Sequence, residues 1–331
     1  MNSQTVSRPW SNFQSVPTNL RRRPDGAVQI DNARWGFDKS TSVSVSEMPG
    51  RFDDLVVEPR HVKDVYLGVK PFAPTALAAH SVLIFEMDPM HPVTNSKGET
   101  DSGLVLSPEA HFHQGEAYDM KGSYEMVYQV GTWKDTVEKT TVREGLNQVR
   151  YKLNLSSEQK QQLLENSLEL ALQDHSGECY NLFTRSCHSV TVDLLNSVIP
   201  EEQQIRRDLV EDVHNPLAVL PPYGDVLLAG HDLLADHPRE VVQTDSGAPL
   251  RATRGSRLVQ KLSRHTGLYR AACTGLGALA GSLSCAALGP LGLCLVPGAA
   301  HLGRTVGETL ARRANSVYTP AREILKGGQA Q

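Results

Sequence analysis

The stretch LAAHSVLIFE at residues 77–86 decides the fold of this chain. A short and nearly continuous apolar run is typical of a strand that is buried on both faces, so we expect a strand over residues 79–87 with His80 at its beginning. A second stretch, YNLFTRSCHSVTVDLL at residues 180–195, predicts a helix that begins near Cys187 and is ended by Pro200. The two stretches together predict a strand-borne imidazole and a helix-borne thiol.

The segments around these two stretches predict a domain of the α+β class. Ser156 and Gln159 form a capping-box pattern, and leucines follow at helical spacing, which predicts a helix over residues 157–173. Further strands are predicted from alternating or continuous apolar residues. They cover residues 65–69, 103–106, 123–130 and 148–153. We expect an antiparallel sheet packed against the helix that carries Cys187.

Changes in composition predict four regions along the chain. Residues 1–55 are polar and rich in Ser, Asn, Arg and Pro, which is typical of a disordered leader. Residues 56–200 form the predicted domain, and residues 201–260 are expected to be an irregular connection. Residues 261–331 are expected to form an apolar helical hairpin or a transmembrane segment with basic flanks.

The segment from Ala271 to Ala300 is the basis for that last expectation. It contains no charged residue, and it is longer than the roughly 20 residues that span a bilayer as a helix. Arginines flank it on both sides, and Pro290 and Pro297 interrupt it. One tilted span and a re-entrant hairpin both fit, and a helical pair buried on the domain is the alternative. We therefore expect a membrane-associated protein.

Composition limits the classes of partner and site. A net charge of -4 without a basic, aromatic-interleaved stripe gives no reason to expect nucleic-acid binding. Five cysteines, unevenly spread, do not indicate a secreted disulfide framework. The beginning of the chain has no apolar signal segment, so we expect no cleavable signal peptide, and either a cytoplasmic location or export by a signal-independent route.

Cys187 and His80 predict a chemistry. The thiolate is the nucleophilic form of cysteine, and both a helix N-terminus and a neighbouring imidazolium favour it, so we expect Cys187 to have a lowered pKa. A metal site is not expected, because His111 and His113 could pair on one strand face but lack a supporting third ligand. Cys179 is interpreted as a structural cysteine. No cofactor is expected.

Several segments together resemble the Lnb-type N-terminal periplasmic domain, a bacterial domain of poorly defined function. The resemblance covers about residues 60–200. It rests on LAAHSVLIFE, LSPEAHF, GEAYDMKGSYEMVYQV, YKLNLSSEQKQQLLENSLELA and YNLFTRSCHSVTVDLLN. That family is grouped with the circularly permuted NlpC-type papain-like proteins, in which histidine precedes cysteine. Members typically show Asn-Cys-Thr at the helix start, where this chain has Ser-Cys-His.

The resemblance implies a role for each matching residue. Cys187 would be the nucleophile and His80 the general base. A third residue would orient the imidazole, and it would come from the segment after the next strand, with Glu109 as first choice and His111 as second. Backbone N–H groups at the helix start would form part of an oxyanion hole. Substrate contacts would fall to Tyr180, Asn181 and His188.

Three functions therefore follow as hypotheses. The first is a thiol hydrolase that attacks an amide or ester through an acyl-enzyme on Cys187. The second is a membrane-facing acyltransferase, positioned by residues 271–300. The third is a non-catalytic interaction or assembly-helper module. A protein, peptide or lipid acyl group would be the substrate of the first two, and only those two require a reactive Cys187.

Overall fold

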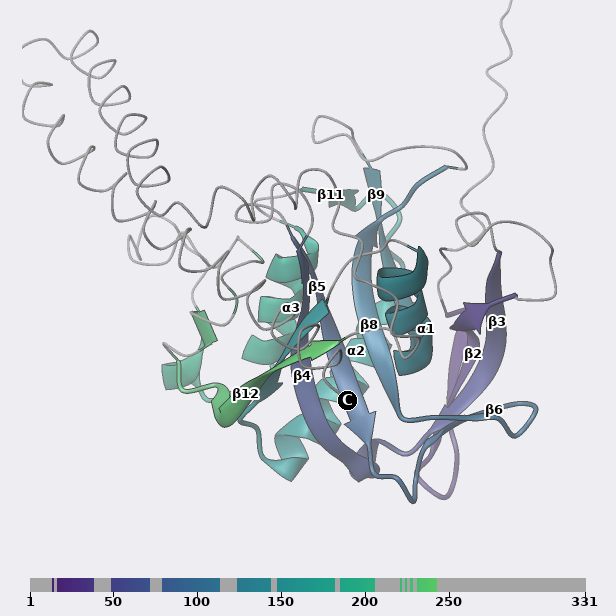
Figure 1. Cartoon of the computed structure of the whole chain (residues 1–331), viewed down its shortest axis with the longest axis horizontal. Helices are drawn as coiled ribbons and strands as arrows, with labels where there is room; N and C mark the ends of the chain where they lie inside the picture. The colour runs from purple at the N-terminus through teal and green to yellow at the C-terminus, as the bar shows by residue number, and fades with distance from the viewer. Residues whose placement is uncertain are drawn as a thin grey trace, which may run out of the picture. The chain divides into compact units, whose positions relative to one another are not determined.

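The computed structural model describes part of the chain. It covers residues 14, 17–38, 49–71, 79–113, 124–143, 148–181, 185–205, 221, 224, 227–228 and 231–242. The chain divides into two compact units, residues 1–70 with 80–250 and residues 71–79 with 251–331. The described elements belong almost entirely to the first unit, shown in Figure 1.

One twelve-stranded sheet dominates this unit (Figure 1). Its strands follow the order β12-β10-β4-β5-β8-β9-β2-β3-β6-β7, with β1 added to β2 and β11 added to β9. The strands are β1 (Asn19–Arg22), β2 (Val28–Phe37), β3 (Gly50–Val57), β4 (Val62–Pro71), β5 (Ala79–Met87), β6 (Val93–Asn95), β7 (Thr100–Asp101), β8 (Gly103–Ala110), β9 (Tyr124–Thr132), β10 (Gln148–Leu153), β11 (Cys179–Tyr180) and β12 (Leu234–Val242). The sheet is mixed, because β2 pairs with β9 in parallel at Arg34 and Gly131.

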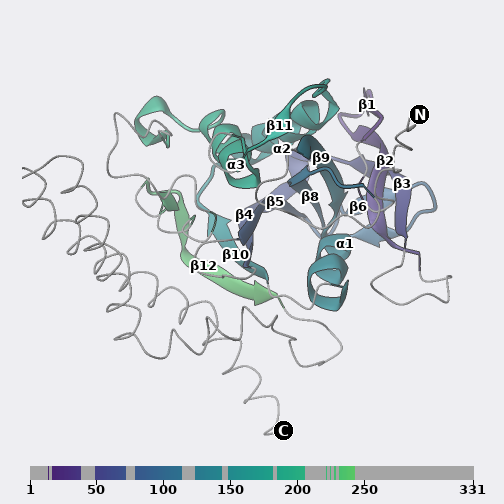
Figure 2. The same ribbon diagram turned by 90° about the horizontal axis from the view of Figure 1, so that it is seen from above.

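The described helices are short and cover the two faces of the sheet. They are α1 (Trp133–Val137), α2 (Ser157–Leu172) and α3 (Cys187–Asn196), with a π-helical segment (Glu138–Arg143) after α1 and single 3-10 turns at η1 (Pro59–His61) and η3 (Glu201–Gln203). Figure 2 shows α2 and α3 on one face and α1 on the other. Strands β5 and β8 lie between these layers, and all eight residues of β8 are buried.

The expected fold class is wrong. We predicted a permuted papain-like α+β fold with an antiparallel sheet, whereas the structure has one large mixed sheet of twelve strands. The difference begins in the predicted leader, because β1, β2 and most of β3 lie in it. Arg34 is one of the charged residues whose presence predicted a disordered leader. It is fully buried in β2, where its guanidinium pairs with Asp135 of α1, a residue distant in sequence.

The elements around the sheet centre agree with the sequence. The predicted strands correspond to β4, β5, β8, β9 and β10, and the predicted helices correspond to α2 and α3. The capping box at the start of α2 is confirmed, since the Ser156 side chain accepts from the Gln159 N–H and the Gln159 side chain accepts from the Ser156 N–H. Local capping chemistry and apolar periodicity therefore determine these boundaries.

The region after α3 differs from the predicted irregular connection, because β12 pairs with β10 and extends the sheet. The apolar segment 271–300 lies outside the described residues. Within the part of the chain that the structure describes, no helix combines the length and the apolar character needed to cross a membrane.

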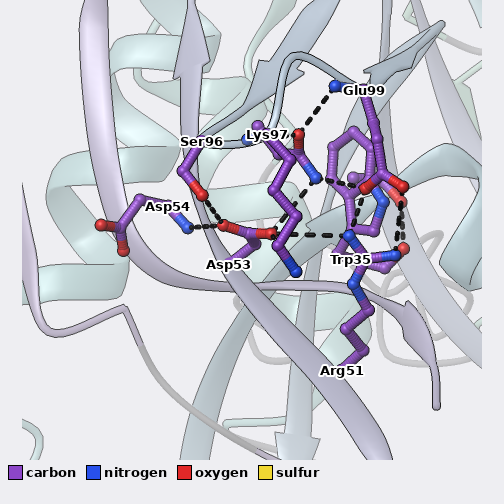
Figure 3. Close-up of polar contacts among 9 residues, drawn as sticks. Trp35, Arg51, Asp53, Asp54, Ser96, Lys97 and Glu99 are labelled. Atoms are coloured by element: carbon purple, nitrogen blue, oxygen red, sulfur yellow. Dashed lines mark hydrogen bonds and ion pairs between the residues drawn. The ribbon is translucent and has the colours of Figure 1, made fainter.

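Charged side chains cover the edge formed by β3, β6 and β7. Arg51 forms an ion pair with Glu99, and Asp53 accepts hydrogen bonds from Asn95 and Ser96 (Figure 3). Exposed edges of sheets pair with other chains unless charges or short strands prevent it. This polar network therefore holds the short β6–β7 hairpin on β3.

Candidate active site

Cys187 opens α3 and is buried, with 2% of its surface exposed. Ser186 caps the helix, and its side chain and that of Ser189 form a capping box. Two donors from different strands reach the sulfur: the N–H of Ser81 in β5 at 3.5 Å and the hydroxyl of Tyr180 in β11 at 3.6 Å. Such donors favour a thiolate over a thiol.

The β5–β8 register runs from Leu83–Leu106 to Glu86–Gly103, so Ser81 lies beyond the residues of β5 that are paired with β8, and its N–H donates to the thiol. His80 directly precedes Ser81 in the chain. Given the 3.5 Å contact, standard backbone lengths place the Cα of His80 within about 6 Å of the sulfur. The thiol and the imidazole-bearing residue are therefore neighbours in space.

The imidazole of His80 is engaged in a chain of hydrogen bonds. Its Nε2 lies 2.7 Å from the Ser107 hydroxyl oxygen, and that hydroxyl donates to Glu109 Oε1 at 2.8 Å. Because the Ser107 proton is used toward the carboxylate, the Ser107 oxygen accepts, and Nε2 of His80 is the donor. In this arrangement Nδ1 of the neutral ring is the nitrogen that can accept a proton.

Glu109 is surrounded by groups that keep it ionised. Lys139 donates to Oε1 at 2.7 Å, and the side-chain amide of Gln14 donates to Oε2 at 2.9 Å. Burial alone would raise the pKa of Glu109, but the positive charges of Lys139 and Lys70 and the nearby His80 hold it below its usual range. The carboxylate is thus a fixed negative charge at the end of the His80–Ser107 chain.

His80 and Cys187 approach β5 from different sides. Successive side chains of a strand point to opposite faces. The Ser81 hydroxyl lies 3.1 Å from Nδ1 of His188 in α3, so Ser81 faces the α3 layer and His80 faces the α1 layer. His80 lines a pocket there together with Ser107, Glu109 and Lys139. Among the described residues, no hydrogen bond joins the imidazole to the thiol.

The electrostatics differ from the sequence-based expectation for the nucleophile. Burial raises the pKa of the Cys187 thiol, and the hydrogen bonds from Ser81 and Tyr180 only partly oppose this. Burial also lowers the pKa of His80, to about 3, with Lys70 acting in the same direction and Glu109 against it. The expected lowered thiol pKa is therefore wrong for this conformation, and both groups are neutral at pH 7.

The other predicted site residues have separate surroundings. His111 follows β8, where its N–H donates to the Glu125 carbonyl, and burial lowers its pKa. His188 is 1% exposed and faces Ser81, while Asn181 is exposed and pairs through its backbone with Arg185. Of the three predicted substrate contacts, Tyr180 reaches the sulfur through its hydroxyl and His188 through its backbone N–H.

Sequence reasoning missed Ser81, Ser107, Lys139 and Gln14. Ser107 carried a signal, because it stands two residues before Glu109 and therefore shares its face of β8. Lys139 and Gln14 carried none, since they reach Glu109 from segments distant in sequence. The described residues contain one cluster with metal-ligand geometry, Glu58 with His61 and His91, and it lies near the other end of β5.

Comparison with known proteins gives one significant match. No curated protein and no solved structure matches the chain significantly. The family of the Lnb N-terminal periplasmic domain matches residues 51–220, which are 170 of the 331 residues and include β4 through α3. A periplasmic domain implies an exported or membrane-associated protein. The chain belongs to the Lnb N-terminal periplasmic domain family.

Proposed function

We propose that this protein is a thiol-dependent hydrolase in which Cys187 attacks the carbonyl of an amide or ester and His80 is the general base. One observation carries the proposal: the Ser81 N–H that donates to the sulfur belongs to the residue directly after His80. The Ser107–Glu109 chain supports it, because it leaves Nδ1 of His80 able to accept a proton.

The reaction would run through a thioester on Cys187. The sulfur bonds to the carbonyl carbon while its proton passes to Nδ1 of His80, and the carbonyl oxygen becomes an oxyanion. Because His80 faces the α1 layer and Cys187 lies in the α3 layer, this transfer requires the His80 side chain to turn toward the sulfur at the start of β5. The bond to the leaving amine or alcohol then breaks, and that group takes the proton from His80. Water, deprotonated by His80, next attacks the thioester and releases the acid and the thiol. The Ser186 side chain already accepts from the Ser189 N–H, so the backbone N–H groups of Cys187 and His188, at the start of α3, would stabilise the oxyanion.

The pKa directions exclude a preformed thiolate–imidazolium pair in this conformation. With a pKa near 3, His80 is neutral and a weak base at pH 7, so proton transfer during attack would require a rearrangement that reduces the burial of its ring. Cys187 is also neutral, because burial raises its thiol pKa. The ionised Glu109 would stabilise the imidazolium that forms during attack, through Ser107.

A non-catalytic interaction module is the second candidate, and the burial of Cys187 favours it. A thiol that is 2% exposed has no direct path to a substrate carbonyl, so turnover requires the surrounding segments to open. In the module, Cys187 and its donors would serve packing alone. The two candidates differ in whether the sulfur ever becomes acylated.

Acyl transfer to the sulfur tests the proposal directly. The full chain is incubated with a panel of p-nitrophenyl esters and chromogenic peptide amides, then quenched in acid for mass spectrometry. We expect an acyl mass on Cys187 and product release that Cys187→Ser abolishes. Cys179→Ser is the matched control, because Cys179 is exposed and its described hydrogen bond goes to the Gly177 carbonyl.

Two results would count against the hydrolase. Acylation of Cys179 in place of Cys187 would identify a merely exposed thiol. No turnover with any substrate, together with an unchanged fold in Cys187→Ser, would support the interaction module. An acyl-enzyme that passes its acyl group to an added amine or lipid alcohol faster than to water would identify an acyltransferase.

A further inference from the structure

We propose that Glu58, His61 and His91 form a binding site for a divalent transition-metal ion of the Zn²⁺ class. These residues come from the two loops at one end of the β4–β5 pair. Glu58 directly precedes the η1 turn, and His61 is the last residue of that turn, just before β4. His91 lies in the turn after β5. The proposal does not depend on the proposed hydrolase function, since His80 and Cys187 lie near the other end of β5.

The ligand atoms lie close enough together to converge on one small ion after a local adjustment. Glu58 Oε1 lies 3.3 Å from Nδ1 of His91, and Glu58 Oε2 lies 3.5 Å from Nε2 of His61. One ligand atom from each of the three residues can be chosen so that all lie within 4.8 Å of one another. An ion bound at 2.0–2.1 Å by tetrahedral nitrogen and oxygen ligands has ligand atoms about 3.3–3.4 Å apart.

The backbone holds the three residues in place without a metal. The His61 N–H donates to the Glu58 carbonyl at 2.9 Å, and the Asp88 N–H donates to the His61 carbonyl at 2.9 Å. The His91 N–H in turn donates to the Asp88 carbonyl at 2.8 Å. This series of bonds connects all three ligand residues, so the chain entropy of bringing them together is lost on folding rather than on binding the ion.

The two imidazoles are stacked, with ring centres 3.5 Å apart and planes 1° from parallel. Nitrogen lone pairs lie in the ring planes, so the rings must tilt for both lone pairs to converge on one ion. The side chains of His61 and His91 are 29% and 37% exposed, which leaves room for that rotation. Tilting the rings is the local rearrangement that binding would require.

Arg60 occupies part of the proposed coordination sphere. Its Nη2 donates to Glu58 Oε2 at 2.8 Å, and its Nε donates to Nε2 of His61 at 3.1 Å. The guanidinium thus satisfies the same lone pairs that a metal ion would take. Its side chain is 56% exposed and can turn into solvent, so Arg60 would compete with the ion without excluding it.

The donor set indicates the kind of ion. Imidazole nitrogens suit Zn²⁺, Cu²⁺ and Ni²⁺, whereas Ca²⁺ and Mg²⁺ prefer sites made of oxygen ligands. Two histidines and one carboxylate provide three protein ligands, and a water molecule would complete the tetrahedron. The bound ion would join the η1 loop to the β5–β6 turn and stabilise this end of the sheet.

The test measures metal uptake by the full chain after chelator treatment. We expect about one equivalent of Zn²⁺ per chain, and a visible absorption band when Co²⁺ replaces it. His91→Ala and Glu58→Gln should each weaken binding more than tenfold, since loss even of groups that only orient ligands costs about 10- to 100-fold. His231→Ala is the matched control, a partly exposed histidine outside the cluster.

Arg60→Ala supplies a result that misfolding cannot imitate. Removing the competing guanidinium should tighten Zn²⁺ binding and raise the unfolding temperature in the presence of Zn²⁺. The proposal is overturned if neither the wild type nor Arg60→Ala takes up a stoichiometric ion. It is equally overturned if His231→Ala weakens binding as much as His91→Ala does.

Discussion

The ion pair between Arg34 and Asp135 provides the sharpest test of how the N-terminal strands are held. Arg34 Nε lies 2.7 Å from Asp135 Oδ1, and the two side chains are 0% and 5% exposed. The pair joins β2 to α1, and Asp135 lines the same pocket as His80. Burial raises the pKa of Asp135, and the Arg34 guanidinium opposes that rise, so removal of Arg34 leaves a buried carboxyl without its counter-charge.

We expect Arg34→Met or Asp135→Asn to lower the free energy of unfolding by about 3–5 kcal/mol, because each removes one charge of a buried ion pair. For a unit of this size that corresponds to roughly 6–20 °C in the midpoint of thermal unfolding. Urea denaturation followed by circular dichroism measures the loss. The double variant Arg34→Met/Asp135→Leu should recover much of it, since an apolar pair avoids the desolvation of two charges.

Arg21→Ala is the control for this experiment. Arg21 pairs with Asp31 on the surface with 59% of its side chain exposed, and surface pairs contribute about 1 kcal/mol or less. A loss below about 1 kcal/mol in both buried single variants would refute the reasoning. The reasoning would also be refuted if the double variant lost as much free energy of unfolding as the less stable of the two single variants.

Three further outcomes follow from the structure. Ser107→Ala should lower kcat for the proposed hydrolysis by about 10²–10⁴-fold with a smaller change in KM, because His80 loses its link to the carboxylate of Glu109. A rise in KM by the same factor as the fall in kcat would contradict this. Burial lowers the pKa of His80 to about 3 and that of His188 to about 4. Folding therefore favours the neutral rings, and the free energy of unfolding is highest above about pH 6.5 and decreases as the pH falls from about 6.5 toward about 3–4. Urea midpoints measured from pH 8 to pH 4 should fall accordingly, and substituting His188 with Asn should flatten the slope. Gly103→Ala should destabilise the unit by at least about 1–3 kcal/mol, because the added Cβ would lie 2.4 Å from the backbone oxygen of Phe85, and a denaturation midpoint equal to wild type would refute this.

The sequence determined the central elements because their signals are local. An apolar run defines β5, a capping box defines the start of α2, and the cysteine-bearing helix α3 follows its own capping residue Ser186. The roles expected for His80, Cys187 and Glu109 came from the resemblance to the Lnb-type domain, whereas the elements that carry them came from these local signals. Such features depend on neighbours three or four positions away, so a single sequence is sufficient to predict them.

Only the tertiary structure decided which face each group occupies and which distant residue completes it. The polar composition of residues 1–55 predicted a disordered leader, yet β1, β2 and most of β3 lie in it, and Arg34 of β2 forms a buried ion pair with Asp135 of α1. The thiol pKa depends on burial, which no spacing reveals, and it reversed the expected direction. The Glu58, His61 and His91 cluster joins two loops across β4 and β5. Pairing between residues far apart in the chain is set by packing of the whole sheet, and local patterns do not encode it.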